Sequence, residues 1–166
     1  MPATMMTTPI GHLRVSVDGD GRLTRIDLIG ADGPAGAEDP SSDASAAAPV
    51  VATLERYFAG DLGAIDVIEV APEHGTDFQR SVWDALRRIP AGETVSYAEL
   101  AAAVDRPTAF RAVGSANGAN PIPIVVPCHR VVNADGALGG YALGLDVKRW
   151  LLDHEGAPVA GPGRIP

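Results

Sequence analysis

The sequence predicts a mixed α/β (α+β) fold in two parts, a small strand-and-helix unit followed by a helical unit. Alternating apolar residues with turn residues between them occupy residues 12–28, whereas two helix-capping boxes open at residues 76 and 96. The change of pattern places the domains at 1–74 and 75–166. With 166 residues and 46% apolar side chains, the chain can bury an ordinary core.

The N-terminal unit begins with a predicted β-hairpin over residues 12–28, where Asp18-Gly19-Asp20-Gly21 supplies the turn. Residues 30–48 are rich in Gly, Ala, Ser, Asp and Pro without periodicity, which predicts a flexible loop. Apolar residues at helical spacing predict a helix from Val50 that Gly60 ends, and residues 65–70 predict a further strand. This unit carries no obvious chemistry.

The C-terminal unit starts with three predicted helices. The capping box at 76–79 opens a helix that Pro90 ends, and the second capping box opens a helix over 96–104. Thr108 is placed to cap a third helix over 109–116. Two short helices joined by a tight turn form a helix-turn-helix candidate.

The third helix has an unusual number of small residues around one arginine. The small residues are Ala109, Ala112, Gly114, Ser115 and Ala116, and the arginine is Arg111. One interpretation is a tightly packed helix pair. The other is a recognition helix whose backbone approaches a DNA minor groove, with the inserted arginine replacing a displaced base.

The following segments are predicted to build a pocket. Prolines at both ends make residues 122–126 a buried extended segment at an edge, which Asn120 could tie to the preceding helix. Residues 135–144 form a glycine-rich loop around Tyr141. A last helix is predicted over 145–155, ending at Gly156.

Glu155 is electrostatically unfavourable in that helix, because a helix C-terminus prefers cations. A compensating partner is therefore expected. The candidates are a nearby arginine and His129.

Charge and composition narrow the function classes. The net charge of −8 comes mostly from residues 1–77, while residues 78–130 carry two more bases than acids. That leaves room for a local phosphate-binding face of modest strength. No apolar run is long enough for a membrane span, and the first residues are not those of a secretory signal. With one cysteine, we expect a cytoplasmic protein without a metal site.

That cysteine is Cys128, which stands beside His129 after an apolar run. A buried cysteine usually serves as a small hydrophobe, and burial keeps its thiol inert. The alternative is a nucleophile activated by the neighbouring imidazole.

Several motifs together resemble the O6-alkylguanine-DNA alkyltransferases, in particular the bacterial members of that family. The motifs are Thr8-Pro9-Ile10-Gly11, Tyr57-Phe58-Ala59-Gly60, Gly75-Thr76-Asp77-Phe78-Gln79, Val82-Trp83, Ser96-Tyr97, Arg111-Ala112-Val113-Gly114, Asn120-Pro121, Pro127-Cys128-His129-Arg130-Val131 and Leu151-Leu152-Asp153-His154-Glu155-Gly156. The similarity runs nearly end to end and is strongest from residue 75. It implies an N-terminal ribonuclease-H-like domain and a C-terminal winged-helix-type domain.

The resemblance also implies a function, which is DNA repair by direct damage reversal. The alkyl group of O6-alkylguanine passes irreversibly to Cys128, so that each molecule acts once. His129 would take the thiol proton, Glu155 would orient His129, and Tyr97 would protonate the leaving base. Asn120 completes the catalytic set. Arg111 would fill the gap left by the flipped base.

The implied partner is double-stranded DNA bearing O6-alkylguanine, bound through the minor groove by a monomer, without cofactor or metal. The implied binding residues are Arg111, Tyr97, Ala112, Gly114, Ser115, Arg130, Val131, Tyr141 and Ala142. Two positions depart from better-known members: Ala142 lacks a serine hydroxyl, and Phe110 replaces a small residue. Phe110 either faces the core or acts as a second wedge against DNA.

Two other functions remain open. The first is a protein that binds alkylated bases without repairing them, which the presence of Cys128 disfavours. The second is a cysteine hydrolase, which would need an oxyanion hole that no motif suggests. Alkyl-size preference, activity on O4-alkylthymine and cooperative assembly on DNA are not decided by the sequence.

Overall fold

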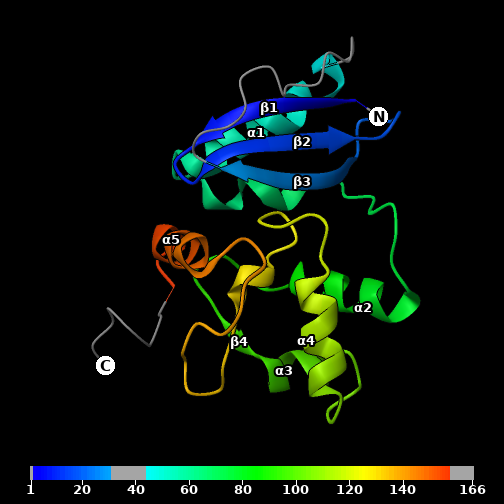
Figure 1. Cartoon of the computed structure of the whole chain (residues 1–166), viewed down its shortest axis with the longest axis vertical. Coiled ribbons are helices and arrows are strands. Elements are labelled where there is room, and N and C mark those ends of the chain that lie inside the picture. The colour runs from blue at the N-terminus through cyan, green and yellow to red at the C-terminus, as the bar shows by residue number, and fades with distance from the viewer. Residues whose placement is uncertain (1, 31–43, 158–166) are drawn as a thin grey trace. The chain divides into compact units, whose positions relative to one another are not determined.

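The computed structural model describes residues 2–30 and 44–157, and these divide into two compact units. One unit combines residues up to His74 with Pro121–Val125, and the other combines Gly75–Asn120 with residues from Val126 onward. The first unit is built on a sheet and the second on helices (Figure 1). All five predicted catalytic residues belong to the second unit.

The first unit contains a three-stranded antiparallel sheet in the order β1 (Ala3–Thr8), β2 (Gly11–Val17) and β3 (Leu23–Gly30). The predicted hairpin is confirmed, with Val15 paired to Ile26 in the register of β2 and β3. Strand β1 was not predicted. Its buried residues, Ala3 and Met6, are three positions apart, so they lack the alternation that marks a half-buried strand.

Three helical segments complete this unit: η1 (Ala44–Ala47), α1 (Ala48–Phe58) and η2 (Leu62–Val67). Helix α1, the helix predicted from Val50, lies along one face of the sheet (Figure 1). The predicted strand over 65–70 is wrong, because residues 65–67 belong to η2 and only Val70 forms a bridge, to Leu23. Short apolar runs do not distinguish strand from helix by periodicity.

The predicted loop over 30–48 is tested at its ends alone. Its first residue belongs to β3, and residues 44–48 form η1 and the start of α1. Residues 31–43 lie outside the described residues.

Residues 122–126 are buried as predicted but are not extended. They form a turn, in which the backbone N–H of Val125 donates to the carbonyl of Pro123 at 2.9 Å. Ile124 has φ of 77°, which is strained for a β-branched residue. The carbonyl of Pro121 accepts from the N–H of Ile26 at 3.0 Å, which ties this segment to β3.

The second unit is built from α2 (Asp77–Leu86), α3 (Tyr97–Ala103), α4 (Phe110–Gly118) and α5 (Leu145–Glu155). Both predicted capping boxes are confirmed at the starts of α2 and α3. Helix α5 has the predicted bounds and ends at Gly156, whose φ of 73° is left-handed. None of the helices in residues 2–30 and 44–157 is long and apolar enough to cross a membrane.

Helices α3 and α4 form the predicted helix-turn-helix, and both pack on α2. The predicted cap at Thr108 is wrong: α4 begins at Phe110, and its N-cap residue Ala109 supplies no side-chain hydrogen bond. Trp83 of α2 anchors the pair by donating from Nε1 to the carbonyl of Ala116 at 2.8 Å. A Cβ on Gly75 would lie 2.6 Å from the Trp83 ring, so only glycine fits there.

A short parallel ladder joins β4 (Val95–Ser96) to β5 (Val131–Val132). Tyr97 follows β4 directly, and the 3-10 helix η3 (Cys128–Arg130) precedes β5 directly. This ladder therefore places the phenol and the thiol segment in the same part of the unit.

Candidate active site around Cys128

Cys128 opens η3 and is only 5% exposed. Its backbone N–H donates to the carbonyl of Val126 at 2.8 Å, and Nδ2 of Asn120 donates to the same carbonyl at 2.7 Å. Burial raises the pKa of the Cys128 thiol to about 11, although a hydrogen bond from Asn120 and the charge of Lys148 act in the opposite direction. Cys128 is therefore protonated at neutral pH and needs a base to become a nucleophile.

His129 is suited to be that base. Its ring is fully buried, and Nε2 lies 2.8 Å from Oε2 of Glu155. Because a carboxylate accepts, Nε2 carries the hydrogen, and Nδ1 presents its lone pair. Nδ1 is buried and has no hydrogen-bond partner. Burial lowers the pKa of His129 more than Glu155 raises it, so the imidazole is neutral at pH 7.

Glu155 is held by Arg130 as well as by His129. Arg130 donates to Oε1 from Nε and to Oε2 from Nη2, both at 2.9 Å, and Nη1 donates to the carbonyl of Ile89 at 2.6 Å. Burial would raise the pKa of Glu155, but hydrogen bonds from His129 and Arg130 lower it to about 2. Both expected partners thus compensate this carboxylate at the end of α5.

The position of Arg130 does not support its expected contact with DNA or substrate. The side chain is 2% exposed, and its three donor groups point at Glu155 and Ile89. A guanidinium paired in this way has no face left for a phosphate or a base. We therefore assign Arg130 to the support of Glu155.

Tyr97 is half-buried between two glycines. A Cβ on Gly114 of α4 would lie 4.0 Å from the Tyr97 ring, and one on Gly139 would lie 3.5 Å from its hydroxyl. Burial, and then the negative charge that a Cys128 thiolate carries, raise the pKa of Tyr97, while a hydrogen bond from Asn117 acts against them. The phenol is therefore a proton donor at neutral pH.

Sequence reasoning missed two buried polar residues of this site, Asn117 and Lys148. Nδ2 of Asn117 donates to the Cys128 carbonyl at 3.5 Å. Nζ of Lys148 donates to the carbonyls of Val131 and Gly140 at 2.6 and 3.1 Å. Burial lowers the pKa of Lys148 to about 8, although the negative charge of a Cys128 thiolate acts to raise it.

Helical spacing could have found both residues. Asn117 shares a buried face of α4 with Val113 and Ala116. Lys148 is the only lysine of the chain and lies on the buried face of α5 with Leu151, Leu152 and Glu155. A polar residue in an apolar stripe predicts a buried partner.

The remaining predicted binding residues differ in exposure. Arg111, Ala112 and Ser115 are exposed on α4, and Gly114 is half-buried on the same helix. Val131 is buried in β5, Tyr141 is half-buried near His129, and Ala142 is exposed in the following loop. The Tyr141 ring lies 6.5 Å from the His129 ring, edge to face. Phe110 is 49% exposed, so the expectation that it faces the core is wrong.

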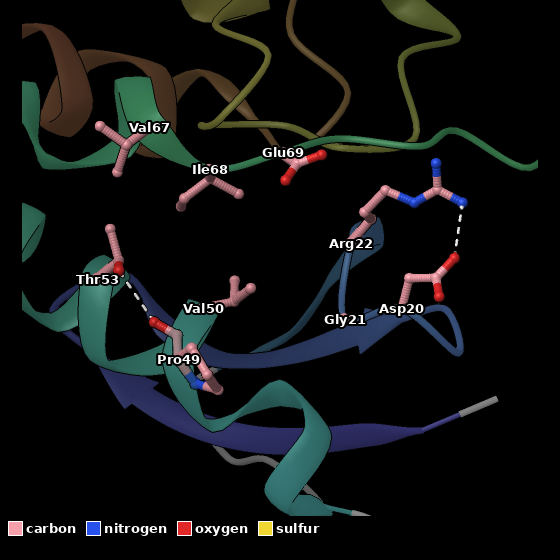
Figure 2. Close-up of a pocket in the computed structure, with 9 residues that line it drawn as sticks. All are labelled: Asp20, Gly21, Arg22, Pro49, Val50, Thr53, Val67, Ile68 and Glu69. Carbon is pink, nitrogen blue, oxygen red and sulfur yellow. Dashed lines mark hydrogen bonds and ion pairs between the residues drawn. The ribbon is translucent and has the colours of Figure 1, made fainter.

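A pocket of about 190 Å³ lies in the first unit, away from all these residues in sequence. Its walls come from the β2–β3 turn, the start of α1 and the end of η2 (Figure 2). Arg22 is paired with Asp20 at 3.4 Å and Thr53 donates to the Pro49 carbonyl at 2.9 Å, so these polar groups already have partners. The lining contains no cysteine or histidine, and no predicted site residue belongs to it.

Known proteins are similar to this chain over its whole length. A family model described as "6-O-methylguanine DNA methyltransferase, DNA binding domain" matches residues 77–157. A methylated-DNA–protein-cysteine methyltransferase of Haemophilus influenzae is 39% identical over 164 residues, covering 96% of this chain and 89% of that protein. One of Salmonella typhimurium is 60% identical over 103 residues, covering 62% of this chain.

The matched region spans 60% of the Salmonella protein's length. Among solved structures, Mycobacterium tuberculosis OGT in complex with DNA is 40% identical, with a TM-score of 0.77 and coverage of 95% of this chain and 96% of that chain. The similarity to the Haemophilus protein and to this structure includes both units. The chain belongs to the methylated-DNA–protein-cysteine methyltransferase family.

Proposed function

We propose that this protein repairs DNA by moving the alkyl group of O6-alkylguanine onto Sγ of Cys128. The observation that carries this proposal is the state of His129, whose Nε2 is fixed by Glu155 while Nδ1 is buried without a partner. General-base activation needs a neutral imidazole with a free lone pair beside a protonated thiol. His129 has that lone pair and follows Cys128 directly in the chain. The names of the Haemophilus and Salmonella relatives support the same activity.

The reaction is a single displacement in which every proton has a destination. Nδ1 of His129 takes the Cys128 proton, through a water, as the sulfur–carbon bond forms and the carbon–O6 bond breaks. The Tyr97 hydroxyl protonates the leaving guanine and regains its proton from His129, so that the thiol proton ends on the base. The thioether has no onward reaction, and each molecule acts once. The buried Arg130–Glu155 pair keeps His129 oriented throughout.

DNA binding is assigned to the exposed side of α4. Arg111, Ala112 and Ser115 are exposed there, and small residues allow the helix backbone to approach a narrow groove. Arg111 would enter the stack where the alkylated base has left it. Phe110, exposed beside Arg111, would act as a second apolar wedge. The partner is duplex DNA bound through the minor groove by a monomer, in the reducing cytoplasm.

The test is the mass of the Cys128 peptide after incubation with a duplex carrying O6-methylguanine. We expect one methyl group per protein molecule and no second turnover. The matched control is Cys128→Ala, which should bind the duplex without gaining mass. Binding by the natural chain without methyl gain would indicate a lesion-binding protein, and repeated turnover of activated esters would indicate a cysteine hydrolase.

A further inference from the structure

Asn117 is a polar side chain on the buried face of α4. It is 5% exposed and shares that face with Val113 and Ala116. Its Nδ2 donates to the Cys128 carbonyl at 3.5 Å, which is at the long end of the range for a hydrogen bond. Burying an amide costs free energy unless its groups are well paired. This one long bond therefore does not account for an asparagine at this position.

The second partner of Asn117 is the phenol of Tyr97. The Tyr97 ring lies beside Gly114, where an added Cβ would be 4.0 Å from Cε1 of the ring. Gly114 and Asn117 are three positions apart and so share a face of α4. At the end of the ring, Asn117 forms a hydrogen bond with the Tyr97 hydroxyl. On the other side, a Cβ on Gly139 would lie 3.5 Å from that hydroxyl, so the phenol is held between α4 and the glycine-rich loop over residues 135–144.

The amide nitrogen of Asn117 faces the phenol. Oδ1 of Asn117 is buried and has no hydrogen-bond partner, so the Tyr97 hydroxyl does not donate to it. The amide nitrogen has two N–H groups, which can serve the Cys128 carbonyl and the phenol oxygen at once. The Tyr97 oxygen is therefore the acceptor, and its own hydrogen is left for the leaving base.

This arrangement favours the form of Tyr97 that the proposed reaction produces. When the phenol gives its proton to the leaving guanine, its O–H bond breaks and negative charge develops on the oxygen, until His129 returns a proton. Burial makes that charge unfavourable. An N–H group binds a charged oxygen about twice as strongly as a neutral one. The amide thus stabilises the transition state more than it stabilises the resting phenol.

We propose that Asn117 is a positioning residue for Tyr97, which orients the phenol for proton transfer and stabilises the phenolate that the transfer leaves. The proposal rests on the proposed function. Because a hydrogen bond to a charged group is stronger than one between neutral groups, loss of the amide donor should slow methyl transfer by about tenfold to 100-fold.

The experiment is a double-mutant cycle between Asn117 and Tyr97. Asn117→Leu removes the donor at similar volume, and Tyr97→Phe removes the hydroxyl that the donor serves. Single-turnover transfer rates on an O6-methylguanine duplex are measured for the natural protein, the two single variants and the double variant. The control is Gly118→Ala, because an added Cβ at this exposed position of α4 meets nothing within 4 Å.

Asn117→Leu should lower the rate by about tenfold to 100-fold in the natural background and should have no further effect in the Tyr97→Phe background. Gly118→Ala should keep the natural rate. Equal losses in both backgrounds would overturn the proposal, because Asn117 would then support only the backbone of Cys128. Asn117→Asp, which has the shape of asparagine without an N–H group, should repeat the pattern, and full activity in that variant would also contradict the proposal.

The titration of Tyr97 tests the hydrogen bond without any methyl transfer. Protein made with fluorotyrosine gives a fluorine NMR signal for each of its three tyrosines, and the signal that Tyr97→Phe lacks belongs to Tyr97. The pKa of Tyr97 should be higher in Asn117→Leu than in the natural protein, because the donor that favours the phenolate is gone, and should not move in Gly118→Ala. An unchanged pKa in Asn117→Leu would refute the proposal. A raised pKa together with no methyl transfer by the natural protein would instead refute the proposed function.

Discussion

Replacing His129 by glutamine should remove the base while keeping the scaffold around it. A glutamine amide can donate to Oε2 of Glu155 as Nε2 of His129 does at 2.8 Å, so Glu155 and Arg130 keep their partners. The amide cannot take a proton from Cys128 at any ordinary pH. We therefore expect His129→Gln to fold and bind DNA but to transfer the methyl group slowly.

The expected loss in transfer rate follows from the pKa of the Cys128 thiol. With the pKa of Cys128 at about 11, removing its proton at pH 7.4 requires about 5 kcal/mol, at 1.36 kcal/mol per unit. Only about one molecule in 4000 then holds a thiolate without help. A positioned general base contributes about 10²-fold to 10⁴-fold. The variant should be slower by that factor in single-turnover transfer from an O6-methylguanine duplex.

The pH dependence separates loss of the base from general damage. Burial lowers the pKa of His129 below its usual value of 6.5, so the natural protein has a working base throughout the range from pH 7 to 9. In His129→Gln, the rate should follow the thiolate population and rise about tenfold per pH unit. The rate of the natural protein divided by the rate of His129→Gln should therefore fall by about 100-fold between pH 7 and pH 9.

Lys148 titrates near pH 8 in both proteins, so its effect cancels from that ratio. Parallel pH profiles would refute the role of His129 as base. Thermal unfolding of both proteins is the control for folding.

Three further results are expected. Arg111→Ala should slow repair in duplex DNA far more than reaction with free O6-methylguanine, because the free base needs no extrusion; equal losses would mean that its role is misassigned. Phe110→Ala should show the same pattern with a smaller loss, and an effect on the free base would exclude the wedge. The free energy of unfolding should fall as pH decreases from 4.5 to about 2, because the pKa of Glu155 is lower in the folded state; that stabilisation is complete above pH 4.5, and its loss amounts to about 3 kcal/mol. Urea titrations at pH 5 and pH 3 should differ by about 2 kcal/mol of that loss, and equal values would contradict the depressed pKa.

Local interactions explain which elements were predicted correctly. The capping boxes Thr76–Gln79 and Ser96–Glu99 and the left-handed Gly156 are decided within a few residues, and all three hold. Thr108 had the right residue type for a cap, but Ala109 takes the N-cap position. Propensity alone does not fix which of two adjacent residues begins a helix.

The site depends on contacts between distant residues, which explains the errors there. Arginine is a residue type that commonly contacts DNA, but Glu155, 25 positions later, holds Arg130 in the interior. Asn117 approaches Cys128 across 11 positions through a packing arrangement that no motif encodes. The sequence could therefore indicate the nucleophile and its base, whereas the partners that Arg130 and Asn117 contact required the structure.

The high pKa of Cys128 has a consequence for how long the protein lasts in a cell. A single-use reagent is wasted whenever a peroxide or a soluble electrophile reaches it first, and such reagents attack thiolates rather than thiols. A protonated thiol, 5% exposed, is protected from both until a flipped base arrives beside His129. The burial that makes Cys128 a poor nucleophile at rest thus preserves its repair capacity during the wait for damage.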